Sequence, residues 1–204
     1  GSHIAHPYNR SRYAQIPKQD SPDWPVKNKC AKVAWGWGKD LAIALIVVTI
    51  VTTFFMQNLR VQGTSMAPLL DNSHMVIINK FVYTFKSPQR GEIVGFHSDN
   101  VSNPVVKRII GMPGDLIDYR NEKLYVNGTP INNEDKNVMM HGGDIKYPFT
   151  VPQDTYFVLG DNYNNSIDSR FNYIGCVPRN KIIGRIDMRI WPFWKNPFLK
   201  EEIY

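Results

Sequence analysis

Cysteine is scarce in this chain of 204 residues, and the two that it has, Cys30 and Cys176, lie on either side of a long apolar run. If that run crosses a membrane, the two thiols lie on opposite sides of it and cannot pair. The fold is therefore expected to need no disulfide.

Runs of basic residues interleaved with aromatic ones, which mark a nucleic-acid groove, are also missing. The net charge is +6, but residues 1–40 hold seven Lys or Arg against three Asp, which leaves only +2 for the rest of the chain. The basic excess belongs to the amino-terminal arm, and no nucleic-acid partner is expected.

Histidine occurs without metal-ligand spacing, because His74, His97 and His141 are scattered. We expect neither a metal nor another cofactor. The segment Gly63-Thr64-Ser65-Met66-Ala67 lacks the final glycine of a nucleophile elbow, which weakens the hypothesis of a serine hydrolase with a histidine base.

Charge is absent between Asp40 and Arg60, and every residue from Leu41 to Met56 is apolar or threonine. A helix continued to Leu59 would rise roughly 28 Å, close to the ~30 Å hydrocarbon core. Strands rarely reach this length, a core helix is apolar on one stripe only, and a cleavable signal peptide ends in small residues. The sequence therefore predicts a transmembrane anchor at 40–59.

The charges that flank this anchor predict its orientation. Four lysines precede it, whereas Arg60 is followed by no basic residue before Lys80. Residues 1–39, which are polar and contain several prolines, are expected to form a disordered arm in the cytoplasm. The anchor is expected to cross the cell membrane once, and residues 60–204 to form an extracytoplasmic domain. The four lysines are Lys27, Lys29, Lys32 and Lys39. Trp35 and Trp37 are expected at the inner membrane interface.

Beyond the anchor the pattern is mainly β, with short runs of Val, Ile and aromatic residues between turn residues. Asn127-Gly128 is a strong hairpin signal. We expect an antiparallel β-sheet domain tethered by one N-terminal transmembrane helix, with an excursion from the core near 119–155. Four aromatic residues near the end belong either to the core or to a contact with the outer leaflet: Trp191, Phe193, Trp194 and Phe198. The expected strands are 74–79, 92–96, 104–110, 123–126, 156–159 and 181–190.

Ser65 lies between Gly63 and Pro68, two residues that break regular structure on either side of it. A hydroxyl held there can be aimed at a substrate, although a polar turn before a strand has the same appearance.

Lys107 shares one face of a predicted strand with Val105 and Ile109, while Arg108 points to the other face. Burial among apolar neighbours can make a lysine neutral near pH 7, and a neutral lysine is a base. The alternative is a solvated Lys-Arg pair on an edge strand.

A third stretch, from Leu159 to Arg170, is dense in Gly, Asn, Asp and Ser and predicts a loop held by side chain to backbone hydrogen bonds. Asp168 and Arg170 can brace this loop as an ion pair. The alternative is a surface salt bridge, which contributes little.

Together these stretches resemble, in order and in residue identity, the motifs of bacterial type I signal peptidases, which are membrane-anchored proteases that use a serine and a lysine. The resemblance covers roughly residues 40–190, and four ordered motifs are far more specific than any one of them. The matching segments are Ser65-Met66-Ala67-Pro68, Arg90-Gly91-Glu92, Lys107-Arg108 with Gly111-Met112-Pro113-Gly114-Asp115, and Gly160-Asp161-Asn162 with Asn165-Ser166-Ile167-Asp168-Ser169-Arg170.

The resemblance implies that Ser65 is the nucleophile and Lys107 the general base. It further implies that Ser166 orients the lysine amine and that Asp168 and Arg170 brace the loop. The backbone N–H of Ser65 would donate to the oxyanion.

The sequence departs from the family pattern at two positions. Leu69 stands where many members have threonine, which should alter packing rather than chemistry. Gly63 stands where some members carry a serine that also donates to the oxyanion, so the second donor is left open.

The implied substrates are the signal peptides of exported preproteins, cut after an Ala-x-Ala pattern. A peptide paired to a strand edge would place alternate side chains in two shallow pockets, for which we expect Met66 and Val106 to form a wall. The expected partners are the lipid bilayer and the secretion translocon. The alternative function is a catalytically silent, membrane-tethered β-domain that binds peptides or a partner protein.

Overall fold

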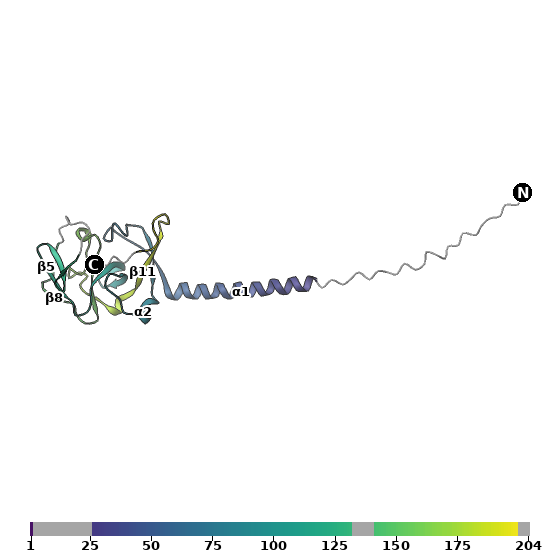
Figure 1. The fold of residues 1–204 in the computed structure, drawn as a ribbon, viewed down its shortest axis with the longest axis horizontal. Coiled ribbons are helices and arrows are strands. Elements are labelled where there is room, and N and C mark those ends of the chain that lie inside the picture. The colour runs from purple at the N-terminus through teal and green to yellow at the C-terminus, as the bar shows by residue number, and fades with distance from the viewer. Residues whose placement is uncertain (2–25, 132–140, 200–204) are drawn as a thin grey trace. The chain divides into compact units, whose positions relative to one another are not determined.

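The chain consists of one long helix followed by a body of β-strands in the computed structural model, which describes residue 1, residues 26–131 and residues 141–199 (Figure 1). The expectation of a mainly antiparallel β fold with one N-terminal apolar helix is confirmed. Most of the predicted arm, residues 2–25, lies outside the described residues.

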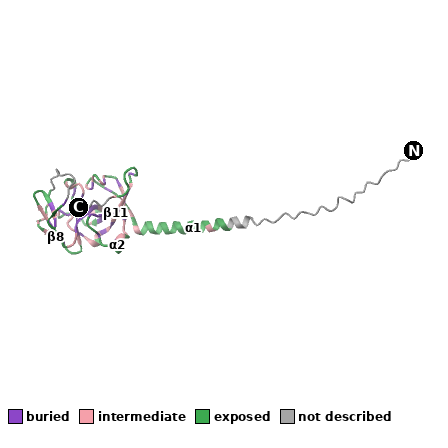
Figure 2. Cartoon of the chain, viewed as in Figure 1, coloured by how far each residue is buried: buried purple, intermediate pink, exposed green. Residues whose placement is uncertain are grey.

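Helix α1 (Val26–Phe55) begins inside the predicted arm and ends earlier than expected. Its segment Lys32–Phe55 is long and apolar enough to cross a membrane, and its apolar side chains are exposed almost throughout (Figure 2). The predicted helical extension to Leu59 is wrong. Residues Met56–Arg60 instead form strand β1, whose backbone groups pair with β2 (Met75–Asn79).

A seven-stranded sheet, antiparallel at every pair, forms the larger part of the body. Each of its five longer strands after β1 overlaps a run that the sequence predicts. In spatial order its strands are β1, β2, β11 (Ile182–Trp191), β3 (Ile93–Ser98), β4 (Val101–Gly111), β9 (Thr155–Leu159) and β10 (Val177–Pro178).

A second, four-stranded antiparallel sheet is formed by strands between Leu116 and Thr150, while the excursion near 119–155 stays a prediction. The predicted hairpin is confirmed, because Asn127 and Gly128 take φ values of 52° and 82°, as the commonest two-residue hairpin turn requires. Residues 132–140 lie outside the described residues. In spatial order the strands are β7 (Thr129–Pro130), β6 (Lys123–Val126), β5 (Leu116–Arg120) and β8 (Phe149–Thr150).

Strand β4 lies inside the large sheet between β3 and β9 and contributes to three buried apolar clusters. Val106 packs in one cluster, Ile109 in a second and Ile110 in a third. A side chain on this strand is therefore withdrawn from water unless it lies at the strand's beginning. The described part of the body also contains three short helices: α2 (Val82–Phe85), η2 (Tyr163–Asn165) and η3 (Arg179–Lys181).

The aromatic residues near the end of the chain are not part of the core. Trp191, Phe193, Trp194 and Phe198 expose between 44% and 75% of their surface. The rings of Trp191, Phe193 and Trp194 contact one another at steep angles, with centroids 5.2 to 5.4 Å apart. The core interpretation is therefore wrong for this group, while a contact with the outer leaflet stays a prediction.

Candidate active site

Lys107 lies in the interior of the large sheet, where its backbone pairs with Val94 of β3. Only 3% of its surface is exposed, so the alternative interpretation of a solvated Lys-Arg pair on an edge strand is wrong. Burial lowers the pKa of the Lys107 ammonium from 10.5 to about 8, although the nearby Asp168 carboxylate raises it. Among the described residues no carboxylate forms an ion pair with the amine, which is therefore partly neutral just above neutral pH.

The amine of Lys107 donates a hydrogen bond of 3.0 Å to the hydroxyl of Ser166. That hydroxyl in turn donates to Asp168 Oδ2 at 2.7 Å. Because the hydroxyl proton of Ser166 is committed to Asp168, its oxygen can only accept from the lysine. A neutral amine that donates to Ser166 keeps its lone pair free for another proton.

Asp168 and Arg170 form a fully buried ion pair, with Arg170 Nε 2.8 Å from Asp168 Oδ1. The guanidinium also donates to the backbone oxygens of His141 and Tyr163, at 2.9 Å and 2.8 Å. The surface salt bridge considered from the sequence is thus excluded. Since both charges have lost water and found several partners, this pair fixes the loop that carries Ser166.

Ser65 follows β1 in a short turn where it is half-buried. Gly63 takes a φ of +81°, a conformation that favours glycine, and its N–H donates to Asn72 at 3.0 Å. After Ser65 the chain turns back, as the bridge between Met66 and Leu70 shows. The predicted pattern of a serine between two residues that break regular structure thus corresponds to a turn in the structure.

Two asparagines of the third stretch hold the turn in place. The backbone N–H of Asn162 donates to the carbonyl oxygen of Ser65 at 2.9 Å, and its side chain donates to that of Thr64 at 3.1 Å. The side chain of Asn165 donates to Thr64 Oγ1 at 2.5 Å. We call these three hydrogen bonds the asparagine clamp. They join segments almost a hundred residues apart.

Gly160 brings the serine turn and the lysine together. A Cβ on this residue would lie 2.3 Å from Ser166 Oγ and 2.4 Å from the carbonyl oxygen of Ser65, so only glycine fits. The hydroxyl that binds the lysine and the backbone of Ser65 therefore lie against the same residue. Within the described part of the chain, no hydrogen bond joins Lys107 Nζ directly to Ser65 Oγ.

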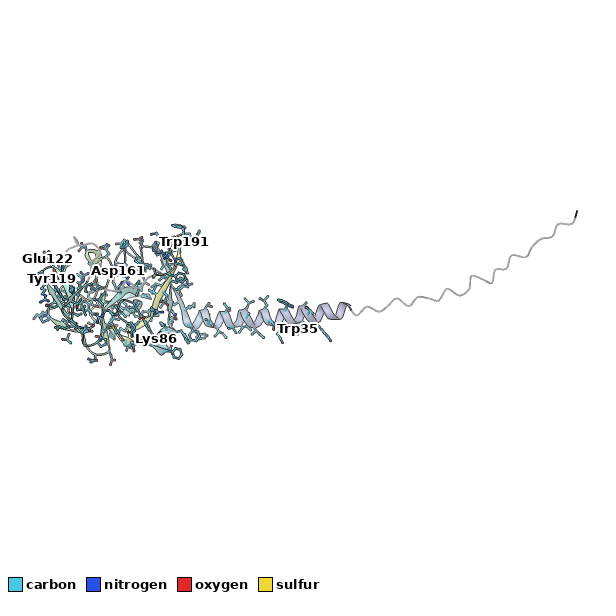
Figure 3. The ribbon with its side chains drawn as sticks, in the orientation of Figure 1. Trp35, Lys86, Tyr119, Glu122, Asp161 and Trp191 are labelled. Atoms are coloured by element: carbon cyan, nitrogen blue, oxygen red, sulfur yellow. The ribbon has the colours of Figure 1, made fainter. Side chains whose placement is uncertain are left out.

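Arg108, next to Lys107, serves a different purpose on the opposite face of β4. Its guanidinium donates two hydrogen bonds to Asp161, of 2.8 and 2.7 Å, and one to the carbonyl oxygen of Gly91. Asp161 lies in the same loop as the asparagine clamp and is labelled in Figure 3. The pair thus attaches the beginning of that loop to the sheet.

The two residues expected to form a pocket wall, Met66 and Val106, lie in one buried cluster. Met66 exposes 1% of its surface and Val106 exposes 7%, so a substrate could touch them only at the edge of that cluster. Their role stays a prediction. Leu69 packs against the same cluster, as expected for a change that affects packing.

A cavity of about 280 Å³ lies elsewhere, lined in part by Arg90, Ile110 and Val126, and includes neither Ser65 nor Lys107. Across residues 26–131 and 141–199, no group of three or more His, Cys, Asp and Glu side chains could hold a metal ion.

The sequence indicated the loop from Leu159 to Arg170 but not the asparagine clamp. Only hydrogen bonds to nearby backbone were expected there, whereas Asn162 and Asn165 bind a turn far away in the chain. The role of Gly160 was also missed. The motif Gly160-Asp161-Asn162 was visible, but nothing in the sequence shows which backbone a glycine must approach.

The chain is similar in sequence to known proteins. Residues 34–191 match the family model "Signal peptidase, peptidase S26". The chain is 40% identical over 164 residues to signal peptidase I P of Bacillus subtilis subsp. natto, a match that covers 76% of this chain and 88% of that protein. It is 37% identical over 176 residues to signal peptidase I of Bacillus caldolyticus, covering 80% and 93%.

A crystal structure of a signal peptidase I from Enterococcus faecalis is 34% identical and covers 49% of this chain and 97% of that one, with a TM-score of 0.40. The family match spans the helix, the serine turn, the buried lysine and the loop that joins them. The chain belongs to the signal peptidase family, peptidase S26, as a type I signal peptidase, a protease that removes signal peptides.

Proposed function

We propose that the chain cleaves signal peptides with Ser65 as the nucleophile and Lys107 as the general base. One observation carries this proposal: a buried lysine that forms no ion pair with a carboxylate of the described residues donates to Ser166, beside the turn that carries Ser65. The neutral amine takes the proton of Ser65 as the hydroxyl attacks the peptide carbonyl, and returns it to the leaving amine.

Ser166, Asp168 and Arg170 support the dyad without touching the substrate. Ser166 holds the amine by one N–H and leaves its lone pair free for Ser65. The buried pair of Asp168 and Arg170 keeps Ser166 at that distance. The backbone N–H of Ser65 donates to the oxyanion, a contribution that can lower the barrier by about 3 kcal/mol.

The edge of β4 supports a binding mode for the substrate. Strand β9 pairs with β4 only from Arg108 to Gly111, so in the described sheet residues 105–107 pair with β3 alone. An extended peptide adds to such an edge through backbone hydrogen bonds and points alternate side chains at the enzyme. In this binding mode the small residues of an Ala-x-Ala pattern lie against Met66 and Val106, which expose only 1% and 7% of their surface.

Helix α1 anchors the enzyme in the bilayer in this proposal, with the amino-terminal arm in the cytoplasm and the catalytic body outside. The apolar segment Lys32–Phe55 and the lysines before it support this orientation. The anchor confines enzyme and preprotein to one membrane surface, where the secretion translocon delivers its substrate.

Cleavage of a preprotein by the purified full-length enzyme tests the dyad. Ser65→Ala and Lys107→Met should each reduce kcat by about 10³-fold or more, because each member of such a unit is needed. Sequencing the new amino terminus of the mature product should find the cut directly after an Ala-x-Ala pattern.

Retained cleavage by the Lys107→Met variant would reject the lysine base. Tight binding of a signal peptide by the wild-type enzyme without any turnover would favour the silent peptide-binding domain instead.

A further inference from the structure

A bulge in β11 turns Arg189 toward the interior of the body. Ile186 pairs with Ile78 of β2. Arg189, three residues further along β11, pairs with Val76, only two residues away from Ile78, because β11 has one extra residue here. Directly opposite residues of an antiparallel pair share a face of the sheet. Val76 and Ile78 are fully buried in the apolar cluster that contains Met66. The bulge therefore places Arg189 on the face that carries this cluster.

Arg189 is deeply buried and binds two separate segments. It exposes only 6% of its surface. Its Nη1 donates to the carbonyl oxygen of Leu69 at 2.9 Å, and its Nη2 donates to that of Asn196 at 2.6 Å. Leu69 lies at the end of the turn that carries Ser65, whereas Asn196 belongs to the chain that follows β11. One planar guanidinium thus bridges the serine turn and this later segment.

The segment that follows β11 runs back along it. The backbone N–H of Arg189 donates to the carbonyl oxygen of Pro197 at 2.7 Å, and the N–H of Leu199 donates to that of Asp187 at 3.1 Å. We call residues 196–199 the returning segment. Leu199 packs against the apolar cluster on which the serine turn rests. Through Arg189, the serine turn is therefore attached both to β11 and to the returning segment.

The charge of Arg189 is not compensated as that of other buried arginines is. Arg108 and Arg170 each bind a carboxylate, whereas Arg189 forms no ion pair within residues 26–131 and 141–199. Its Nε is buried and has no hydrogen-bond partner in the same part of the chain. A buried cation without a counter-charge destabilises a fold, and an apolar side chain of similar size would avoid this loss. The presence of an arginine is therefore explained by what it holds rather than by stability.

The serine turn is held at both ends. The asparagine clamp binds its beginning, at Thr64 and Ser65. Arg189 binds its end, at Leu69. A turn that is attached at one end alone can pivot about that end, whereas a catalytic side chain has to be held within about 0.5 Å of its working position. Attachment at both ends provides this restraint.

A neutral histidine supports the second attachment. His74 exposes 6% of its surface, and its Nδ1 accepts a hydrogen bond of 3.1 Å from the backbone N–H of Asp71. Only an unprotonated Nδ1 can accept this bond. Burial, together with the positive charges of Arg189 and Lys195, lowers the pKa of His74, although the Asp71 carboxylate raises it. Arg189 therefore also favours the form of His74 that holds the chain just beyond Leu69.

We propose that Arg189 is a positioning residue for the nucleophile. It ties the end of the serine turn to β11 and to the returning segment, and so sets the position of the Ser65 hydroxyl relative to Lys107. Arg189 acts through the turn rather than on the substrate. This inference rests on the proposed function, because the position of Ser65 matters only if its hydroxyl attacks the peptide carbonyl.

Peptide cleavage by the full-length enzyme in detergent tests the proposal. Arg189→Ala should reduce kcat by about twentyfold and change KM by about twofold or less, because a displaced nucleophile slows the chemical step more than binding. Arg189→Lys should reduce kcat by only about fivefold, since an ammonium can still bind one of the two carbonyl oxygens. Arg120→Ala is the matched control and should cleave as the wild type does, because Arg120 is exposed on the second sheet.

Rescue by guanidinium separates the two hydrogen bonds from a general loss of packing. Arg189→Ala leaves room for a guanidinium ion, which can bind the same two oxygens and should raise kcat by about fivefold. Millimolar guanidinium chloride suffices, far below the concentrations that unfold proteins. Arg189→Met fills the space with an apolar side chain and should lose kcat without rescue. A loss in Arg189→Ala that guanidinium leaves unchanged, or equal rescue of both variants, would overturn the proposal.

The pH profile gives a second readout. Burial lowers the pKa of Lys107, and the charged groups that act on this amine all lie in the loop from Leu159 to Arg170. The midpoint near 8 should therefore be the same in Arg189→Ala, Arg189→Lys and the wild type. A shifted midpoint would mean that the substitution displaces the lysine rather than the serine turn, and would overturn the inference.

Ser65→Ala in the same assay separates this inference from the proposed function. If Ser65→Ala still cleaves the peptide, the proposed nucleophile is wrong and the inference falls with it. If Ser65→Ala is inactive while Arg189→Ala keeps the kcat of the wild type, the proposed function stands and only the inference is wrong. If Arg189→Ala does not fold, Arg189→Lys decides, because it keeps the charge and one hydrogen bond. A kcat of Arg189→Lys equal to that of the wild type would then overturn the proposal.

Discussion

Lys107 and Arg108 are adjacent buried bases on opposite faces of one strand, and the protein treats them in opposite ways. Lys107 faces a hydroxyl and has no carboxylate partner among the described residues, while Arg108 forms two hydrogen bonds with Asp161. Burial therefore destabilises the charge of the lysine, whereas the charge of the arginine is compensated. Whether a buried base is reactive or structural therefore depends on its hydrogen-bonding partner rather than on how deeply the side chain is buried.

The largest expected effect is on stability, from removing the compensated charge. Arg108→Met leaves the half-buried carboxylate of Asp161 without its partner and should lower the free energy of unfolding by about 3 kcal/mol. Denaturant unfolding of the full-length enzyme in detergent, followed by fluorescence, measures this change. In the Arg108→Met, Asp161→Asn double variant much of the loss should be regained, since no charge is then left unpaired. Equal stability of Arg108→Met and wild type would show that the two faces of β4 do not differ as described.

The second effect concerns the pH dependence of the reaction. Only the neutral amine of Lys107 can act as a base, and burial lowers its pKa to about 8. Below that value kcat/KM for a short peptide should fall by roughly tenfold for each pH unit, and above it the rate should level off. A rate that is constant from acid to alkaline pH would contradict a lysine base.

The third effect has the opposite sign from the first. Between pH 8 and 10.5 the unfolded chain holds a proton on Lys107 that the folded chain has lost, so the stability contributed by this residue rises with pH across that window. Below pH 8 the charge of the buried Lys107 lowers the free energy of unfolding by about 3 kcal/mol. Lys107→Met should therefore stabilise the enzyme at neutral pH by roughly 2 kcal/mol, after the lost hydrogen bond to Ser166 is deducted.

Paired unfolding curves of wild type and Lys107→Met at neutral pH and near pH 10 check this third prediction. The stabilisation should be larger at neutral pH. A variant that is less stable than wild type at neutral pH would mean that the lysine is well compensated in the folded state, as Arg108 is.

The sequence predicted the strands and the positions of the two bases because alternation along β4 depends only on neighbouring residues. The apolar neighbours Val105 and Ile109 also indicated the burial of Lys107. The end of α1 could not be predicted in this way, since Met56 to Leu59 are compatible with a helix and become a strand only because β2 lies beside them. The asparagine clamp was missed for the same reason, because its partners come together only in the folded chain.

The smallest expected effect tests this clamp. Asn165→Ala removes the donor to Thr64 Oγ1 and should reduce kcat by about tenfold with little change in KM, because a slightly displaced nucleophile slows the chemical step more than binding. Peptide cleavage at several pH values provides the measurement. The midpoint of the pH profile should stay near 8, since the hydrogen bond of Lys107 goes to Ser166 and that of the Asn165 side chain to Thr64. Asn164→Ala is the matched control, because the exposed side chain of Asn164 makes no hydrogen bond within the described residues. If Asn164→Ala reduced kcat as much as Asn165→Ala, the loop as a whole would matter and the contact with Thr64 would not.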